Sequence, residues 1–162
     1  MRKNLWAPWR LDYIKGIDEQ KGCFLCDAVR SPDAPDSLVV HREAEAFVIL
    51  NRFPYSHGHL MVAPTGHKAT LDELADGEML ALMRLARRCS RALTKLLKAQ
   101  GHNVGLNIGK AAGAGLKDHL HLHLVPRWVG DTNYMAILAD VRVVSRSLQD
   151  LSGQLRDEFR RG

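Results

Sequence analysis

The sequence predicts an α+β domain with a mainly antiparallel sheet of five strands, one long helix and a C-terminal helix. Short apolar segments bounded by turn residues lie on both sides of one long amphipathic run, an order that favours strands grouped around a single helix. The most informative segment is 119–125, in which three histidines alternate with apolar residues. Successive side chains of a strand point to opposite faces, so the histidines would share one face while the leucines enter the core.

The elements follow in order along the chain. Strands are predicted at 38–41, 46–50, 59–63, 104–108 and 119–125, because each is a short apolar run between polar or turn-forming residues. Pro64 is expected to end the third strand. Thr70 and Glu73 have the spacing of a capping box, so the long helix is predicted to follow them and to close near Gly101. A second helix is predicted at 147–159.

Composition limits the classes of protein that the chain can belong to. The 162 residues suit one domain, and the hydrophobic content of 46% is typical of globular proteins. Apolar runs are too short to span a bilayer, and the N-terminus lacks a secretory signal, so we expect a cytoplasmic protein without membrane contact. The net charge of +5 suits an anionic ligand such as a nucleotide. Sparse aromatic residues and the lack of a basic stripe argue against nucleic-acid binding.

The three cysteines cannot all pair within one chain, and a reducing compartment would keep them as thiols. Cys89 lies within the helical pattern and is interpreted as a small apolar residue. Cys23 and Cys26 form a C-x-x-C pair after Gly22, a spacing typical of metal sites and redox pairs. The pair alone leaves an incidental role open, and two further ligands would be needed for a metal site.

His119, His121 and His123 support two kinds of chemistry. Neutral imidazole is a common metal ligand, and it can also attack an activated phosphorus as a nucleophile. Crowded rings oppose one another's protonation, so the middle ring is expected to be neutral and able to attack. The loop at 109–116 is rich in glycine and alanine, which lets backbone amides approach a phosphate closely.

The segment His119-Leu120-His121-Leu122-His123-Leu124-Val125 resembles the signature of the histidine triad (HIT) nucleotide hydrolases and transferases. The resemblance extends through 51–54, 58–64 and 126–128, and it covers most of residues 20–128. The segments 6–10 and 128–134 are similar to the branch that contains bacterial diadenosine tetraphosphate phosphorylases. The resemblance implies a single HIT domain over 1–162, with a core at 20–128, a Trp-rich arm at 1–19 and a C-terminal extension at 129–162. It also implies that the sheet continues across a homodimer.

The resemblance implies a role for each matched residue. His121 would attack the α-phosphorus of a nucleotide to give a nucleotidyl-histidine, His123 would bind or protonate the scissile oxygen, and His119 would complete the catalytic triad. The residues expected to bind substrate are Asn51, His59, Asn107, Ala114, Gly115 and Trp128. Water as the second acceptor would make the protein a hydrolase, and inorganic phosphate would make it a phosphorylase.

The resemblance also bears on a metal. Several relatives hold zinc with a C-x-x-C pair, a distant histidine and the first triad histidine, and the matching residues here are Cys23, Cys26, His67 and His119. Two thiolates and two imidazoles suit a tetrahedral, structural zinc without an open position. Gly115 departs from the family pattern, because many members carry glutamine or serine four residues before the first triad histidine.

The expected activity is cleavage of dinucleoside polyphosphates such as diadenosine tetraphosphate. One alternative is hydrolysis of nucleoside phosphoramidates. Another is a nucleotide-binding regulatory protein with weak catalysis, which the missing side chain at Gly115 permits. A third is an enzyme whose histidines hold a catalytic metal, against which stands the absence of Asp or Glu alternating into the histidine strand.

Overall fold

The computed structural model describes residues 22–34, 36–131 and 147–161. The elements in chain order are α2 (Phe24–Arg30), β1 (Val39–Arg42), β2 (Ala46–Leu50), β3 (Leu60–Pro64), α3 (Asp76–Leu97), β4 (Gly101–Leu106), the 3-10 helix η1 (Lys110–Ala112), β5 (Leu122–Arg127) and α5 (Leu148–Arg161). The predicted arm at 1–19 and the segment 132–146 of the predicted extension lie outside the described residues. Among the described helices, none combines the length and the apolar character that crossing a membrane requires.

The strands form one antiparallel sheet in the order β1-β2-β3-β5-β4, which confirms the predicted α+β class with its five-stranded sheet. The adjacent β3 and β5 place Met61 opposite His123. On the other side of β5, Gly105 of β4 lies opposite the same histidine. His123 therefore lies near the middle of the three strands that position the candidate site.

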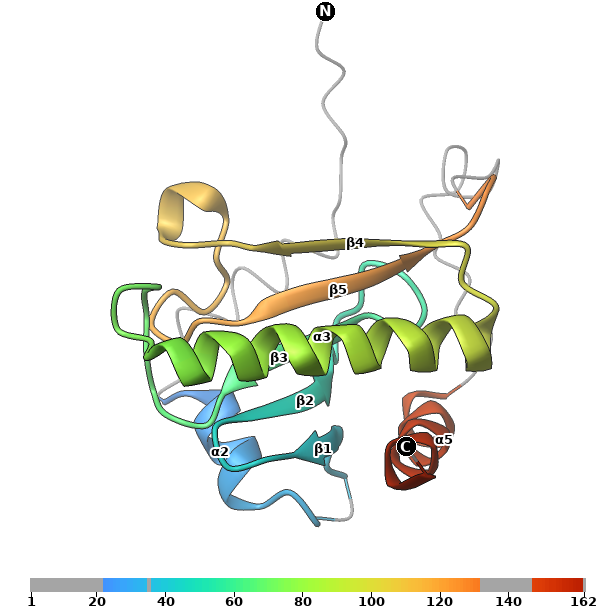
Figure 1. The fold of residues 1–162 in the computed structure, drawn as a ribbon, viewed down its shortest axis with the longest axis horizontal. Helices are drawn as coiled ribbons and strands as arrows, with labels where there is room; N and C mark the ends of the chain where they lie inside the picture. The colour runs from blue at the N-terminus through green and yellow to red at the C-terminus, as the bar shows by residue number, and fades with distance from the viewer. Residues whose placement is uncertain (1–21, 35, 132–146, 162) are drawn as a thin grey trace, which may run out of the picture.

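The long helix α3 runs across one face of the sheet and packs against β2, β3 and β5 (Figure 1). Its buried residues recur at spacings of three and four, as an amphipathic helix requires: Ala81, Leu82, Leu85, Ala86, Cys89, Ala92 and Leu93. Cys89 is fully buried in this core, where we expected a small apolar residue. Leu122 and Leu124 join the same core from β5. Alternation along the strand then places His123 on the opposite face of the sheet.

The start of α3 differs from the predicted start. Thr70 Oγ1 does donate to Glu73 Oε1 at 3.1 Å, but this pair lies in a turn before the helix. Helical geometry begins at Asp76, where the Glu78 carboxylate accepts the backbone N–H of Ala75 at 2.8 Å. The glutamate that satisfies a free N–H group of the first turn is thus Glu78, five residues after the predicted one.

The end of α3 also differs from the prediction. The helix closes at Leu97 because Lys98 adopts a left-handed conformation with φ of 55°. The indole of Trp128 donates to the Leu97 carbonyl at 3.1 Å and so satisfies one of the free carbonyls of the last turn. Gly101, the predicted helix end, instead begins β4.

The two last strands are displaced from their predicted ranges. β4 covers Gly101–Leu106 instead of 104–108, and β5 covers Leu122–Arg127 instead of 119–125. The ladder between β3 and β5 stops at the pair Val62 and Leu122, since Pro64 lacks the N–H that would extend it. His119 and His121 therefore precede the strand. The short helix α2, which contains Cys26, was not predicted.

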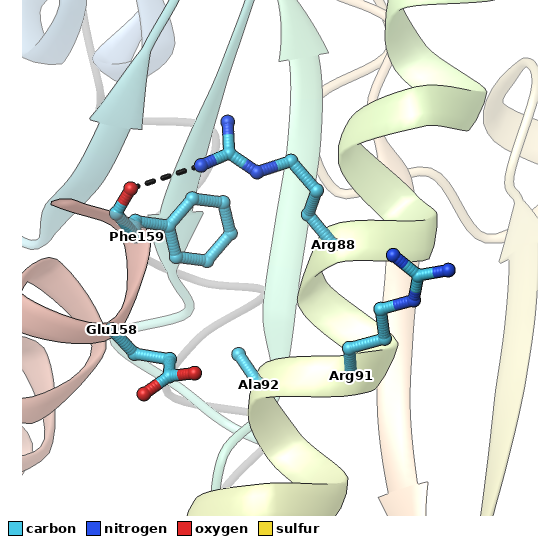
Figure 2. Close-up of a pocket in the computed structure, with 5 residues that line it drawn as sticks. All are labelled: Arg88, Arg91, Ala92, Glu158 and Phe159. Atoms are coloured by element: carbon cyan, nitrogen blue, oxygen red, sulfur yellow. Dashed lines mark hydrogen bonds between the residues drawn. The ribbon is translucent and has the colours of Figure 1, made fainter. Parts of the chain in front are cut away.

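The C-terminal helix α5 starts one residue after its predicted start and ends two residues beyond its predicted end. It packs on β1 and α3, where Arg88 donates to the Phe159 carbonyl at 2.9 Å and lies over the phenyl ring (Figure 2). A small hollow of about 110 Å³ remains between the helices, lined by Arg88, Arg91, Ala92, Glu158 and Phe159. It lies on the α3 side of the sheet, away from His123.

Gly58, which directly precedes His59, has a backbone conformation that other residues adopt only with strain. Its φ is +84°, and a Cβ there would lie 2.5 Å from Cδ1 of Leu97 and 3.1 Å from Cδ2 of Leu93. Gly58→Ala is therefore expected to lower the free energy of unfolding by about 2–4 kcal/mol. Urea denaturation measures this change. Gly101→Ala is the control, because its Cβ meets nothing within 4 Å. A loss below about 1 kcal/mol at Gly58 would contradict the packing argument.

Candidate functional site

Three histidines meet on the face of the sheet that α3 leaves uncovered. His59 Nε2 lies 3.0 Å from His123 Nδ1, and the rings of His121 and His123 meet edge to face with centroids 4.8 Å apart. His59 lies in the turn just before β3, His123 lies on β5, and His121 immediately precedes β5. His59 and His121 are buried and His123 is half-buried. The structure thus brings His59 together with two of the triad histidines.

The ring of His121 is oriented by a backbone carbonyl. Its Nδ1 lies 2.8 Å from the carbonyl oxygen of His119. A carbonyl can only accept, so Nδ1 carries the proton and the neutral ring keeps its lone pair on Nε2. Burial lowers the pKa of His121 and so favours that neutral form, although the bond to His119 acts in the opposite direction. A neutral imidazole with a lone pair on Nε2 can act as a nucleophile.

His123 lies between His59 and Asn107. Asn107 Nδ2 is 3.5 Å from His123 Nε2, at the far end of the ring from His59. Burial, and secondarily the neighbouring His121, lower the pKa of His123 to about 4. The ring is therefore uncharged at neutral pH.

The stability of the fold is expected to depend on pH through His123. Because its pKa is about 4 in the folded chain and about 6.5 in the unfolded chain, the unfolded chain binds more protons between these values. The stabilisation is complete above about pH 6.5 and is lost as the pH falls toward 4. We expect a loss of about 2 kcal/mol after allowance for partial solvent exposure, measured by urea denaturation at several pH values. The variant His123→Gln should lose less, and an equal loss would contradict this assignment.

Asn51 and the turn after it hold His59. The Asn51 side-chain amide Nδ2 lies 3.2 Å from His59 Nδ1, and the backbone N–H of Tyr55 donates to the same nitrogen at 3.1 Å. The Tyr55 ring stacks on His59, with centroids 4.8 Å apart and planes 25° apart. Asn51 and His59, both predicted to bind substrate, thus contact each other directly. Tyr55 belongs to the site as well, and the sequence offered no signal for it beyond its place in the turn.

A groove of about 340 Å³ extends from His123 along β4 and β5. Its lining residues are Tyr55, Asn103, Val104, Gly105, Leu106, Asn107, His123, Val125 and Arg127. At the end away from His123, Arg127 donates to Asn103 at 2.9 Å and forms an ion pair with Asp131 at 2.6 Å. Sequence reasoning did not single out Asn103. The alternation of Asn103 and Gly105 on one face of β4, with Asn107 two residues further on just after the strand, was the available signal.

The other residues predicted to bind substrate are Ala114, Gly115 and Trp128. Ala114 belongs to the loop after η1, where its N–H donates to the Gly109 carbonyl at 3.4 Å, and Gly115 follows it in that loop. Trp128 is turned toward the end of α3 and does not line the groove described above. In the described part of the chain, none of these three residues forms a hydrogen bond to a histidine of the triad. Their roles in substrate binding stay predictions.

Cys23, Cys26, His67 and His119 form a second cluster, in which one possible ligand atom from each lies within 4.8 Å of the others. Cys23 precedes α2 and Cys26 lies in its first turn. Cys23 Sγ is 3.2 Å and Cys26 Sγ is 3.5 Å from His119 Nδ1, and Cys26 Sγ is 3.2 Å from His67 Nδ1. Residues separated by 96 positions in the chain are thus brought together.

This cluster has the chemistry and dimensions of a tetrahedral metal site. Zinc–ligand distances of about 2.0–2.3 Å put neighbouring ligand atoms roughly 3.3–3.8 Å apart, close to the spacings found here. His119 Nε2 donates to the Pro64 carbonyl at 3.0 Å, which leaves the lone pair on Nδ1, the atom that faces both sulfurs. The donor set therefore fits a divalent metal such as zinc.

Comparison with known proteins identifies the family. Residues 32–129 match the model of the HIT domain. The chain belongs to the HIT domain family. It is 34% identical to the AP-4-A phosphorylase of Mycobacterium tuberculosis over 169 residues, which cover 98% of this chain and 85% of that protein. The family membership that the triad segment predicted is thereby confirmed.

Of two further similar HIT proteins, one is named for an enzymatic activity and the other for a bound metal. Adenosine 5'-monophosphoramidase HNT1 of Saccharomyces cerevisiae is 30% identical over 105 residues, covering 65% of this chain and 62% of that one. A Zn-bound histidine triad family protein from Mycobacterium smegmatis superposes with a TM-score of 0.69 and 27% identity, covering 86% of this chain and 94% of that one. The HIT fold is thus shared along most of the chain.

Proposed function

We propose that this HIT domain is a nucleotidyl hydrolase or transferase that cleaves dinucleoside polyphosphates through a nucleotidyl intermediate on His121. The observation that carries the proposal is the bond from His121 Nδ1–H to the His119 carbonyl, because it leaves a lone pair on Nε2 of a ring that contacts His123. The relation to an AP-4-A phosphorylase supports the substrate class. The net charge of +5 agrees with an anionic substrate.

The reaction has two balanced steps. His121 Nε2 attacks the α-phosphorus, a nitrogen–phosphorus bond forms, and the bond to the bridging oxygen breaks with its electron pair left on that oxygen. His123 would hold this oxygen by a hydrogen bond. In the second step a phosphate or water oxygen attacks the same phosphorus, the nitrogen–phosphorus bond breaks, and its electron pair returns to Nε2. Phosphate attacks as an anion, whereas water releases a proton to the solvent as it forms AMP. With diadenosine tetraphosphate, phosphate as acceptor gives ADP and ATP, and water gives AMP and ATP.

The test is incubation with diadenosine tetraphosphate, with and without inorganic phosphate, followed by separation of the nucleotides. ADP and ATP that appear only with phosphate support a phosphorylase, and AMP and ATP without phosphate support a hydrolase. Tight nucleotide binding without turnover in either condition would contradict the enzymatic proposal. That outcome would favour the nucleotide-binding regulatory protein.

A second candidate function is hydrolysis of nucleoside phosphoramidates. The HIT relative named as an adenosine 5'-monophosphoramidase supports it, since that protein aligns with 65% of this chain. Release of AMP from adenosine 5'-phosphoramidate, with diadenosine tetraphosphate left intact, would favour this function over the first.

We further propose that Cys23, Cys26, His67 and His119 hold a structural zinc ion, which would cross-link α2 to the segment before β5. Four protein ligands leave no open position for substrate or water, so the ion would serve the fold and not the reaction. The Zn-bound HIT protein of Mycobacterium smegmatis supports the metal. Thiolate ligands persist in a reducing compartment, so we retain the prediction of a cytoplasmic protein.

We also retain the predicted homodimer, with the sheet continuing through β4. This strand pairs only with β5 in the described part of the chain, and Val104 on it is 49% exposed. Met83 on α3 is 59% exposed, a further apolar side chain for an interface. Val104→Lys is expected to convert a dimer into a monomer, measured as molar mass by light scattering. A wild-type protein that is monomeric at micromolar concentration would contradict the proposal.

The single-domain organisation is retained in the same way. The described elements α2 to β5 lie within the predicted core at 20–128, and α5 belongs to the predicted extension at 129–162. Because α5 packs on both β1 and α3, we propose that the extension and the core form one unit.

A further inference from the structure

Backbone amides of the turn after β2 determine where the protons of His59 lie. The N–H of Phe53 donates to Asn51 Oδ1 at 2.9 Å, which fixes the orientation of the Asn51 side chain. Its NH₂ group therefore faces His59 Nδ1, which also accepts the N–H of Tyr55. A nitrogen that accepts two N–H groups carries no proton of its own. Neutral His59 is therefore protonated on Nε2.

The position of this proton determines the tautomer of His123. His59 Nε2–H must donate to His123 Nδ1, 3.0 Å away, so that nitrogen holds a lone pair. Neutral His123 then carries its proton on Nε2, at the side of the ring that faces the groove and Asn107. Asn107 meets this proton when its side-chain amide is turned to present Oδ1. His121 has the opposite tautomer, since its proton is on Nδ1.

We infer that Asn51 and the backbone amide of Tyr55 act as positioning groups that hold His123 as a neutral Nε2–H donor, so that the site releases anionic leaving groups and does not protonate amines. The inference rests on the proposed nucleotidyl transfer and specifies which substrate bond is cleaved. The site would cleave the phosphoanhydride bond of dinucleoside polyphosphates and not the phosphoramidate bond.

The chemical reason is the proton balance at His123. A neutral imidazole stabilises a departing oxygen by a hydrogen bond, but full transfer of the Nε2 proton would require a new proton on Nδ1. His59 could supply it only if its own Nδ1 were protonated in turn. In the described part of the chain, the donors at that nitrogen are a carboxamide and a peptide N–H, both far too weak as acids to do so. A nucleoside triphosphate leaves as a stable anion without a proton, whereas an amine must be protonated to leave.

The other described residues that line the groove do not offer the missing proton. Among the described residues that line it, Arg127 is the one with a charged side chain, and it is paired with Asp131 at the end away from His123. The reverse of this release is attack by an anion on phosphorus. A site that releases an anion without donating a proton therefore also accepts phosphate as the attacking group without needing a base.

The test compares two substrates that share the adenylyl group. Wild-type kcat/KM for diadenosine tetraphosphate is expected to exceed that for adenosine 5'-phosphoramidate by about 10²- to 10⁴-fold, the contribution of a missing general acid. Asn51→Asp keeps the acceptor for the Phe53 N–H and places a carboxylate beside His59 Nδ1, which favours a proton there. This ratio should then fall by about tenfold or more, because His59 gains a proton to pass on.

Gln100→Glu is the matched control. It likewise turns the amide that accepts a backbone N–H, here that of Val129, into a carboxylate, but Gln100 does not line the groove, so the ratio should not change. Equal cleavage of both substrates by the wild type, or an unchanged ratio in Asn51→Asp, would overturn the inference and leave the proposed function standing.

Nitrogen-15 NMR of the imidazole rings tests the same inference without activity. We expect His123 to carry its proton on Nε2 and His121 to carry its proton on Nδ1, with His59 protonated on Nε2. A proton on His123 Nδ1 would overturn the inference. If these tautomers are found but neither nucleotide is cleaved, the proposed function fails, and the claim about leaving groups fails with it.

Discussion

Replacing His121 with asparagine is expected to lower kcat by about 10⁴-fold or more, because the variant has no nitrogen lone pair with which to attack phosphorus. The asparagine amide can still donate to the His119 carbonyl that now holds Nδ1 of the ring. The fold and the affinity for nucleotide should therefore change little. Steady-state kinetics with diadenosine tetraphosphate, together with calorimetric titration of a nucleotide, measure the two effects separately.

The matched control is His102→Asn. This histidine lies on β4, bonds to Ser90 of α3 at 3.2 Å and faces the opposite side of the sheet from His123. Its replacement should leave turnover within a few-fold of wild type. Activity of His121→Asn within about tenfold of wild type would exclude His121 as the nucleophile.

Loss of one cysteine of the cluster is expected to have the largest effect on stability. Cys26 Sγ contacts both histidines of the cluster, so Cys26→Ala removes a ligand and should abolish stoichiometric zinc. An ion present at about 1,000 times its dissociation constant stabilises a fold by about 4 kcal/mol. For a chain of this length, that corresponds to a fall in Tm of roughly 8–16 °C. Elemental analysis and thermal unfolding of protein purified without chelator measure both.

Cys89→Ala separates loss of metal from loss of a thiol. Cys89 is fully buried on the core face of α3 and is not one of the four cluster residues, so its truncation should cost about 1 kcal/mol and leave the zinc content unchanged. Wild-type protein without zinc, with the same Tm as Cys26→Ala, would show that the four side chains form only a hydrogen-bonded cluster.

The sequence predicted much of this arrangement, for reasons that can be traced to single residues. The alternation of His119, His121 and His123 indicated a strand with a chemical face, and the leucines between them are indeed buried. The alternation could not reveal that Pro64, on the neighbouring strand, ends the ladder before His121. That effect depends on which strands are adjacent, and strand order is a property of the whole fold.

The proton arrangement was beyond sequence reasoning. It depends on peptide N–H groups at Phe53 and Tyr55, which every residue other than proline possesses and no residue pattern records. The metal cluster was inferred from resemblance alone, since spacing cannot show that Cys23 and His119 are neighbours. The helix α2 was missed because seven residues are too few for a helical repeat to be recognised.

Trp128 shows what a sequence position leaves open. The resemblance implies a place near the substrate, which stays a prediction, and the structure adds that the indole donates to the carbonyl of Leu97. Sequence similarity preserves the position of a residue in the chain, but the direction of its side chain depends on where α3 ends. The left-handed conformation of Lys98 sets that end and was not predictable from residue type.

Nucleotidyl transfer through His121 is tested most directly by rapid acid-free quenching of the protein with diadenosine tetraphosphate in the absence of phosphate, followed by peptide mapping by mass spectrometry. We expect an adenylyl group on the peptide that contains His121, located on that histidine, and its disappearance when phosphate is added. Product formation with no adduct during turnover, or an adduct on a different residue, would contradict nucleotidyl transfer through His121.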